Sequence, residues 1–108
     1  MPEAINYSSS LLKAKRFAEA KSLMRKTIPV ARRVLEKDDT TTIRMRWVYA
    51  LALYLHADAT LDEHRKAVTT LEDIERTARR VLGGAHPTAA GMEKSLRTAR
   101  AALRAHSA

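Results

Sequence analysis

A five-residue segment occurs twice in this chain, and this repeat is the feature that most constrains the fold. Ala-Arg-Arg-Val-Leu at 31–35 recurs at 78–82, and Met45 and Met92 are separated by the same number of residues. Internal periods of about 20 to 50 residues are typical of arrays in which each unit buries its apolar side by stacking on a neighbour. We therefore expect a stacked array whose function lies in an extended surface.

The composition indicates that the units of this array are helical. The chain of 108 residues has only three glycines and three prolines, and Ala, Leu, Arg, Lys and Glu predominate. These residues favour helices, and no segment alternates apolar and polar residues as a half-buried strand does. A chain of this length has room for one domain with a modest core. We expect an all-α fold in a single domain, 1–108.

The cysteine content and the hydropathy of the chain indicate the cellular compartment in which we expect the protein. The chain has no cysteine, so disulfides and thiolate metal sites are excluded and a reducing compartment is favoured. The first ten residues lack the apolar stretch of a signal peptide, and no apolar run reaches the about 18 residues of a membrane-spanning helix. We expect a cytoplasmic protein with no membrane span.

Start and stop signals divide the chain into five predicted helices. Candidate N-caps at 37–42 precede the most apolar helix, which runs to about His56 and which we expect to be central. Residues 60–63 match a capping box, and a Gly-Gly pair at 83–84 closes the helix that follows. Pro29 lies inside the second helix and is expected to kink it. We predict a first hairpin at about 2–36, a second at about 39–83 and a terminal capping helix at about 87–106.

Two segments carry a resemblance to a known family. Residues 16–20, Arg-Phe-Ala-Glu-Ala, resemble the start of the second helix of a tetratricopeptide repeat, and Ala67 stands at the corresponding later position. Residues 78–88, Ala-Arg-Arg-Val-Leu-Gly-Gly-Ala-His-Pro-Thr, are similar to the junction between repeats in kinesin light chains. The first junction, 36–40, departs from this pattern, and about five extra residues fall near 56–60. The resemblance implies a right-handed α-solenoid of antiparallel helix hairpins with about two and a half repeats.

The resemblance also implies a function and a set of contact residues. Such repeats are non-enzymatic scaffolds that bind a peptide segment or a partner protein on their concave face, here one with an aromatic or acidic motif. The family's groove positions fall on Ile5, Ser9, Leu12, Lys13, Arg44, Trp47, Leu51, Tyr54, Leu55, Lys94 and Thr98. Aromatic and basic side chains of this kind dominate binding hot spots. Trp47 and Tyr54 have a second interpretation as ordinary core between helices, since large aromatics at helical spacing commonly pack inside.

The charge of the chain supports an alternative function. Twenty Lys and Arg against twelve Asp and Glu give a net charge of +8, which suits nucleic acid or an anionic surface. Six cations gather around the first hairpin turn: Lys13, Lys15, Arg16, Lys21, Arg25 and Lys26. No nucleic-acid-binding motif accompanies them, so a solvated face is the competing interpretation. The arginine pairs at 32–33 and 79–80 are also explained by favourable interaction with helix C-termini.

The sequence gives little indication of metal binding or catalysis. His56 and His64 stand near Asp58, Asp62 and Glu63, but their spacing is not a known ligand motif, so we predict no metal and no cofactor. No catalytic triad order, phosphate-binding loop or dinucleotide motif is present, and we predict no enzymatic activity. A third function is self-association, in which the uncovered face of the last helix or the open groove accepts a second copy.

Overall fold

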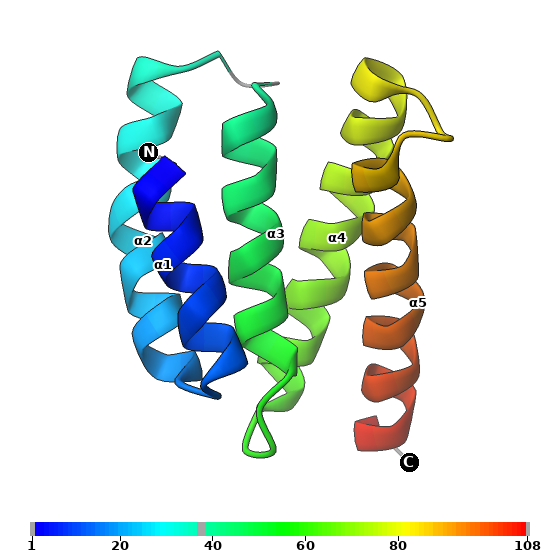
Figure 1. Ribbon diagram of the computed structural model, residues 1–108. Coiled ribbons are helices and arrows are strands. Elements are labelled where there is room, and N and C mark those ends of the chain that lie inside the picture. The colour runs from blue at the N-terminus through cyan, green and yellow to red at the C-terminus, as the bar shows by residue number, and fades with distance from the viewer. Residues whose placement is uncertain (1, 37–38, 108) are drawn as a thin grey trace.

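The computed structural model describes the backbone of residues 2–36 and 39–107, and the side chains of residue 7 and of residues 9–36 and 39–106. Within these ranges the chain is all-α, as the sequence predicts (Figure 1). The helices are α1 (Pro2–Lys13), α2 (Phe17–Val34), α3 (Thr40–Tyr54), α4 (Leu61–Leu82) and α5 (Pro87–Ser107). Their bounds agree with the predicted ones to within two or three residues.

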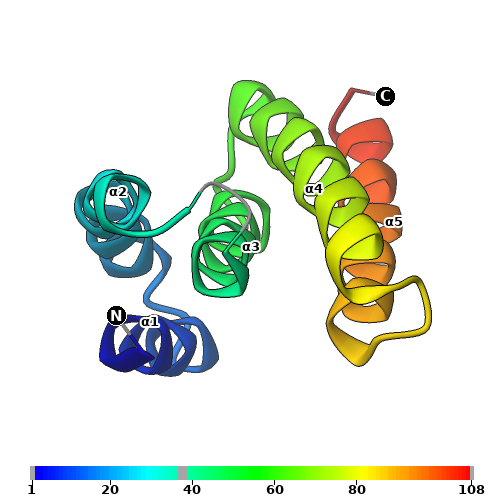
Figure 2. The ribbon, with the colours of Figure 1, turned by 90° about the horizontal axis from the view of Figure 1, so that it is seen from above.

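Helix α3 lies at the centre of the molecule, as its apolar composition predicts. Each helix packs against the next one along the chain, and α3 also contacts α1 and α5. Seen from above, α1 and α2 lie on one side of α3, and α4 and α5 lie on the other (Figure 2). Nine of the 15 residues of α3 are buried. Because α3 has neighbours on several sides, it supplies side chains both to the face that contains α1 and to the face that contains α2 and α4.

One continuous apolar core connects α2, α3, α4 and α5. Its largest fully buried side chains include Met24, Met45, Leu53, Leu71, Ile74 and Met92. A smaller cluster of Leu11, Ala20 and Ala52 joins α1 to α2 and α3. Among the described residues, no helix is both long and apolar enough to cross a membrane.

The helix ends form where local side chains satisfy free backbone groups. The Asp39 carboxylate accepts a hydrogen bond of 2.8 Å from the Thr41 amide at the start of α3. At the start of α4, Thr60 and Glu63 form the predicted capping box in both directions. Gly83 ends α4 at φ 91°, in the left-handed region that favours glycine. Helix α2 continues through Pro29 to Val34, and the predicted kink at that proline stays a prediction.

We expect Thr60→Ala to lower the free energy of unfolding by about 1 kcal/mol, because it removes the acceptor for the Glu63 amide. Urea unfolding followed by circular dichroism measures this change. Thr69→Ala is the matched control, since Thr69 lies on the exposed side of the same helix and its hydroxyl only bonds the Arg65 carbonyl. Equal losses in the two variants would contradict a specific role of the cap.

Candidate functional site

A hollow of about 220 Å³ lies between α1 and α3, where the sequence predicts a groove. Its lining residues are Ser9, Leu12, Arg44, Trp47, Val48 and Leu51. Residues three or four apart share one face of a helix, so Arg44, Trp47 and Leu51 form one stripe of α3, and Ser9 and Leu12 face it from α1. The hollow is mainly apolar, with the exposed Arg44 among its lining residues.

The indole of Trp47 is held between α3 and α5. Its Nε1 donates a hydrogen bond of 3.0 Å to Ser95 Oγ on α5. The ring also lies against Gly91, where an added Cβ would stand 2.8 Å from the ring carbon Cη2. Glycine at this position therefore lets α5 approach the indole. Trp47 is partly buried against the core and also lines the hollow, and its predicted role in binding a partner stays a prediction.

Tyr54 is a core residue, with 7% of its surface exposed. Burial raises the pKa of its hydroxyl above the ordinary value, and a hydrogen bond with Ser95 opposes that rise. Ser95 thus interacts with Trp47 and Tyr54, two of the three aromatic residues of α3. In this arrangement Tyr54 presents little surface to a partner and serves mainly to position α5.

Five of the eleven predicted contact residues line the hollow: Ser9, Leu12, Arg44, Trp47 and Leu51. Lys13, Leu55, Lys94 and Thr98 are exposed but do not line it. Thr98 donates its hydroxyl to the Lys94 carbonyl at 3.1 Å. The side chain of Ile5 lies outside the described residues.

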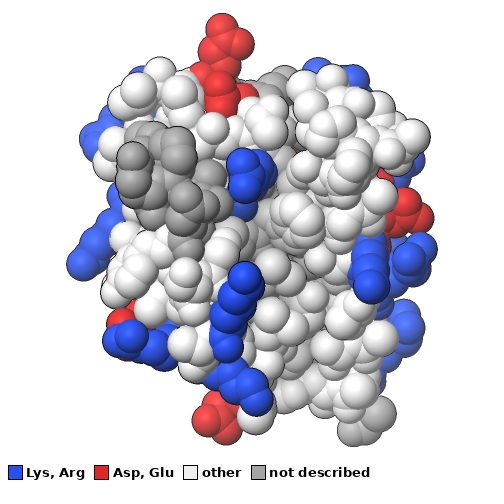
Figure 3. All heavy atoms as spheres, viewed as in Figure 1, with Lys and Arg blue, Asp and Glu red and all other residues white. Residues whose placement is uncertain are grey.

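Positive charge dominates the middle of this face. Figure 3 shows Lys and Arg side chains across the centre, over α1 and α3, whereas Asp and Glu side chains are visible only at its margins. Lys13, Arg44 and Lys94 are exposed on α1, α3 and α5 respectively. An acidic ligand is therefore favoured on this face over a basic one.

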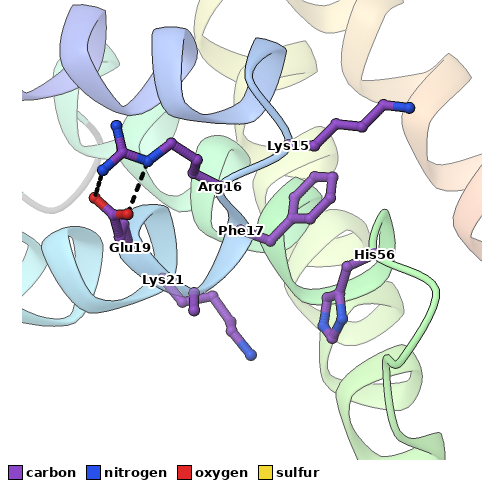
Figure 4. Close-up of a pocket in the computed structure, with 7 residues that line it drawn as sticks. Lys15, Arg16, Phe17, Glu19, Lys21 and His56 are labelled. Atoms are coloured by element: carbon purple, nitrogen blue, oxygen red, sulfur yellow. Dashed lines mark hydrogen bonds and ion pairs between the residues drawn. The ribbon is translucent and has the colours of Figure 1, made fainter.

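The basic patch predicted around the first hairpin turn is in part internally paired. It borders a hollow of about 270 Å³ in which the Phe17 ring packs on His56, with 5.8 Å between ring centroids (Figure 4). Arg16 donates to both carboxylate oxygens of Glu19, at 2.8 and 2.6 Å. Lys21 donates to Glu63 on α4 at 2.6 Å. These pairs reduce the charge that this patch can offer to nucleic acid.

The histidines near the α3–α4 turn have separate partners. His56 Nε2 lies 3.7 Å from Glu63 Oε1. The His64 ring packs on His106, with 4.9 Å between centroids, and burial together with His106 lowers the pKa of His64. In the described part of the chain, no group of three or more His, Asp or Glu side chains is arranged to hold a metal ion.

A second cluster of cations, which the sequence does not predict as a group, lies on the opposite side of α3 from the hollow beside Trp47 and includes Arg25 of the first hairpin patch. Arg25, Arg46 and Lys66 surround Tyr49, and they come from α2, α3 and α4. Arg46 and Tyr49 stand three residues apart on α3, which is the only local signal for this cluster. The remaining members come together through the tertiary packing of α2 and α4.

No family model matches the chain, and no match was found among curated proteins or solved structures. The resemblance to tetratricopeptide repeats therefore stays a prediction that is carried by the residues quoted for it.

Proposed function

We propose that this protein is a non-enzymatic interaction scaffold that binds a peptide segment of a partner on the face formed by α1, α3 and α5. The observation that carries the proposal is the hollow between α1 and α3, where the Trp47 indole is held by Ser95 and Gly91 from the side of α5. A fixed aromatic ring loses little conformational freedom on binding, which is why such rings act as anchors at interfaces.

The chemistry of this face suggests an extended segment that carries an aromatic or aliphatic side chain beside acidic residues. The hollow is small and suits one anchoring side chain rather than a whole ligand. Exposed cations on three neighbouring helices then contact carboxylates that flank the anchor. In this proposal the partner is a protein or peptide and not a nucleic acid.

The scaffold in this proposal is a right-handed tetratricopeptide-like solenoid with about two and a half repeats. The support is a burial pattern that follows the sequence repeat. Pairs of residues with the spacing of 31 to 78 are fully buried at both positions: Ala20 and Ala67, Met24 and Leu71, Ala31 and Ala78, Met45 and Met92, Ala52 and Ala99. The uncovered side of α5 is rich in exposed polar residues such as Glu93, Arg97 and Arg104, as expected of a terminal unit.

Selection from a displayed library of random peptides tests the proposal directly. We expect selected peptides to combine an apolar anchor with acidic residues and to change the fluorescence of Trp47, the only tryptophan of the chain. Arg44→Glu should weaken their binding at least about tenfold, because it reverses a charge beside the hollow. The affinity is measured by fluorescence titration at fixed ionic strength.

Arg104→Glu provides the matched control for this experiment. It makes the same charge change at an exposed position of α5 that does not line the hollow. We expect the control to bind the selected peptides within about twofold of the original chain, because a distant surface charge is largely screened. Equal weakening by both variants, or selected peptides that leave Trp47 fluorescence unchanged, would contradict the groove proposal.

A further inference from the structure

A cleft on the opposite side of α3 from the groove gathers four basic side chains. It has a volume of about 240 Å³, and α2, α3 and α4 all contribute to it. The cations are Arg25 and Arg32 from α2, Arg46 from α3 and Lys66 from α4. Arg25 and Arg32 are seven residues apart, which places both on one face of α2. The remaining lining consists of Tyr49, Thr70 and an apolar wall of Met24, Ile28 and Pro29.

The hydroxyl of Tyr49 stands at the centre of this cluster. Tyr49 is 8% exposed, and its Oη accepts a hydrogen bond of 3.1 Å from Lys66 Nζ. Burial raises the pKa of Tyr49, but the interactions with Arg25 and Lys66 outweigh it, and the pKa lies below the ordinary value. A phenol oxygen accepts through its lone pairs and carries one O–H. With Lys66 bonded to one lone pair, the O–H is available to donate to an anion in the cleft.

The positive charge of the cleft exceeds the negative charge that faces it. Asp73 from α4 is bonded to Arg46 at 2.8 Å. The negative charge of Glu63 also raises the pKa of Arg25, but the Glu63 carboxylate is already paired with Lys21. Three of the four cations in the cleft therefore lack a carboxylate partner of their own among its lining residues. This excess suits a doubly charged anion.

A second polar group points to a ligand in the same region. An adjoining hollow of about 420 Å³ shares Arg32 and Arg46 with the cleft and is also lined by Thr42. Thr42 is 2% exposed, and its hydroxyl has no hydrogen-bond partner among the described residues. Buried hydroxyls normally have a partner, so the Thr42 hydroxyl is available to a polar group that extends from the cleft into the adjoining hollow.

We propose that this cleft binds a small organic phosphomonoester, with Arg25, Lys66 and the Tyr49 hydroxyl on the phosphate and the apolar wall on the organic part. A phosphomonoester carries nearly two negative charges at neutral pH, which matches the excess of cations. Guanidinium groups bind phosphate oxygens through paired hydrogen bonds. A phosphodiester carries one charge per phosphate and matches this site less well.

Phenyl phosphate is the probe for this proposal. We expect a saturable one-to-one titration at pH 7.5, followed by the NMR signals of the arginine side chains, with the largest change at Arg25. Arg25→Gln and Lys66→Gln should each weaken binding about tenfold, because each removes a charged hydrogen bond to the anion. Lys26→Gln is the matched control, since it removes the same charge from the next position of α2 and does not line the cleft. We expect it to change affinity less than about twofold.

Two further comparisons separate the parts of the proposal. Tyr49→Phe keeps the buried ring and should weaken binding about fivefold. If that variant does not fold, the proposal is tested by Arg25→Gln and Lys66→Gln alone, because both change exposed residues. Inorganic phosphate should bind more weakly than phenyl phosphate, and equal affinities would overturn the role of the apolar wall. A titration that does not saturate, an equal loss in Lys26→Gln, or tighter binding of an oligonucleotide without terminal phosphates would overturn the site.

Discussion

Trp47→Ala is expected to lower the free energy of unfolding by about 3 kcal/mol. Truncation of a packed aromatic ring leaves a cavity that the surrounding helices fill only in part. In this chain the ring also donates to Ser95 and fills the space over Gly91, so its loss separates α3 from α5. Urea unfolding followed by circular dichroism measures the change without using tryptophan fluorescence.

Leu55→Ala is the control for this prediction. Leu55 also follows the apolar pattern of α3, but 47% of its surface is exposed, so we expect a loss of only about 0.5 kcal/mol or less. A loss of that small size for Trp47→Ala as well would show that the indole is a surface anchor without a packing role.

Gly91 allows a second check on the same contact. Gly91→Ala should destabilise the original chain, because the new Cβ meets the indole at 2.8 Å. In a Trp47→Leu background the clash is removed, and the same substitution should become stabilising by about 1 kcal/mol, since alanine favours a helix over glycine. The sign of the effect therefore reports whether the indole and α5 are in contact.

Local signals made the helix ends predictable from the sequence. The capping box at 60–63 and the glycine after α4 act through neighbours in the chain, so their geometry follows from the residues themselves. The central place of α3 was also predictable, because a helix that is apolar on several sides needs several neighbours. Which neighbouring helix each side chain of α3 contacts was not predictable from such signals.

Tyr54 and Tyr49 show why the site was only partly predictable. Both lie in the apolar second half of α3, residues 47–54, where periodicity does not separate the side that faces α1 from the side that faces α2 and α4. Ser95 on α5 acts on the hydroxyl of Tyr54, and Lys66 on α4 donates to the hydroxyl of Tyr49. Such contacts depend on how the helices cross, so their residues are far apart in the sequence. The stripe of Arg44, Trp47 and Leu51 was predicted only through the resemblance to tetratricopeptide repeats.

Glu63 illustrates a residue whose local role was predicted and whose tertiary role was not. Its carboxylate caps α4 through the Thr60 amide, as the sequence indicates, and it also accepts from Lys21 on α2. Burial raises the pKa of this carboxyl, but the hydrogen bonds from Lys21 and Thr60, with the nearby charges of Lys21 and His56, outweigh it and lower the pKa to about 2. The ionised carboxylate thus joins the first hairpin to the second.

We expect Glu63→Gln to lower the free energy of unfolding at pH 7 by about 3 kcal/mol, which is the free energy that corresponds to a pKa lowered from 4.5 to about 2. Glutamine can still cap the helix, so the loss reports the charge. A carboxyl with a lowered pKa stabilises the fold fully above its unfolded value near 4.5, and this contribution disappears as the pH falls towards 2. The stability difference between the original chain and Glu63→Gln should therefore be constant from pH 6 to 8 and shrink below about pH 4.5.

Urea unfolding across this pH range, with Asp62→Asn as the matched control, measures the effect. Asp62 is the preceding residue, and its side chain is 94% exposed, so its neutralisation should change stability by about 0.5 kcal/mol or less at every pH. Lys21→Gln should reproduce most of the loss and add little to Glu63→Gln, because the two side chains form one pair. A difference between the original chain and Glu63→Gln that does not change between pH 5 and pH 2 would show that the ionised carboxylate does not hold the two hairpins together.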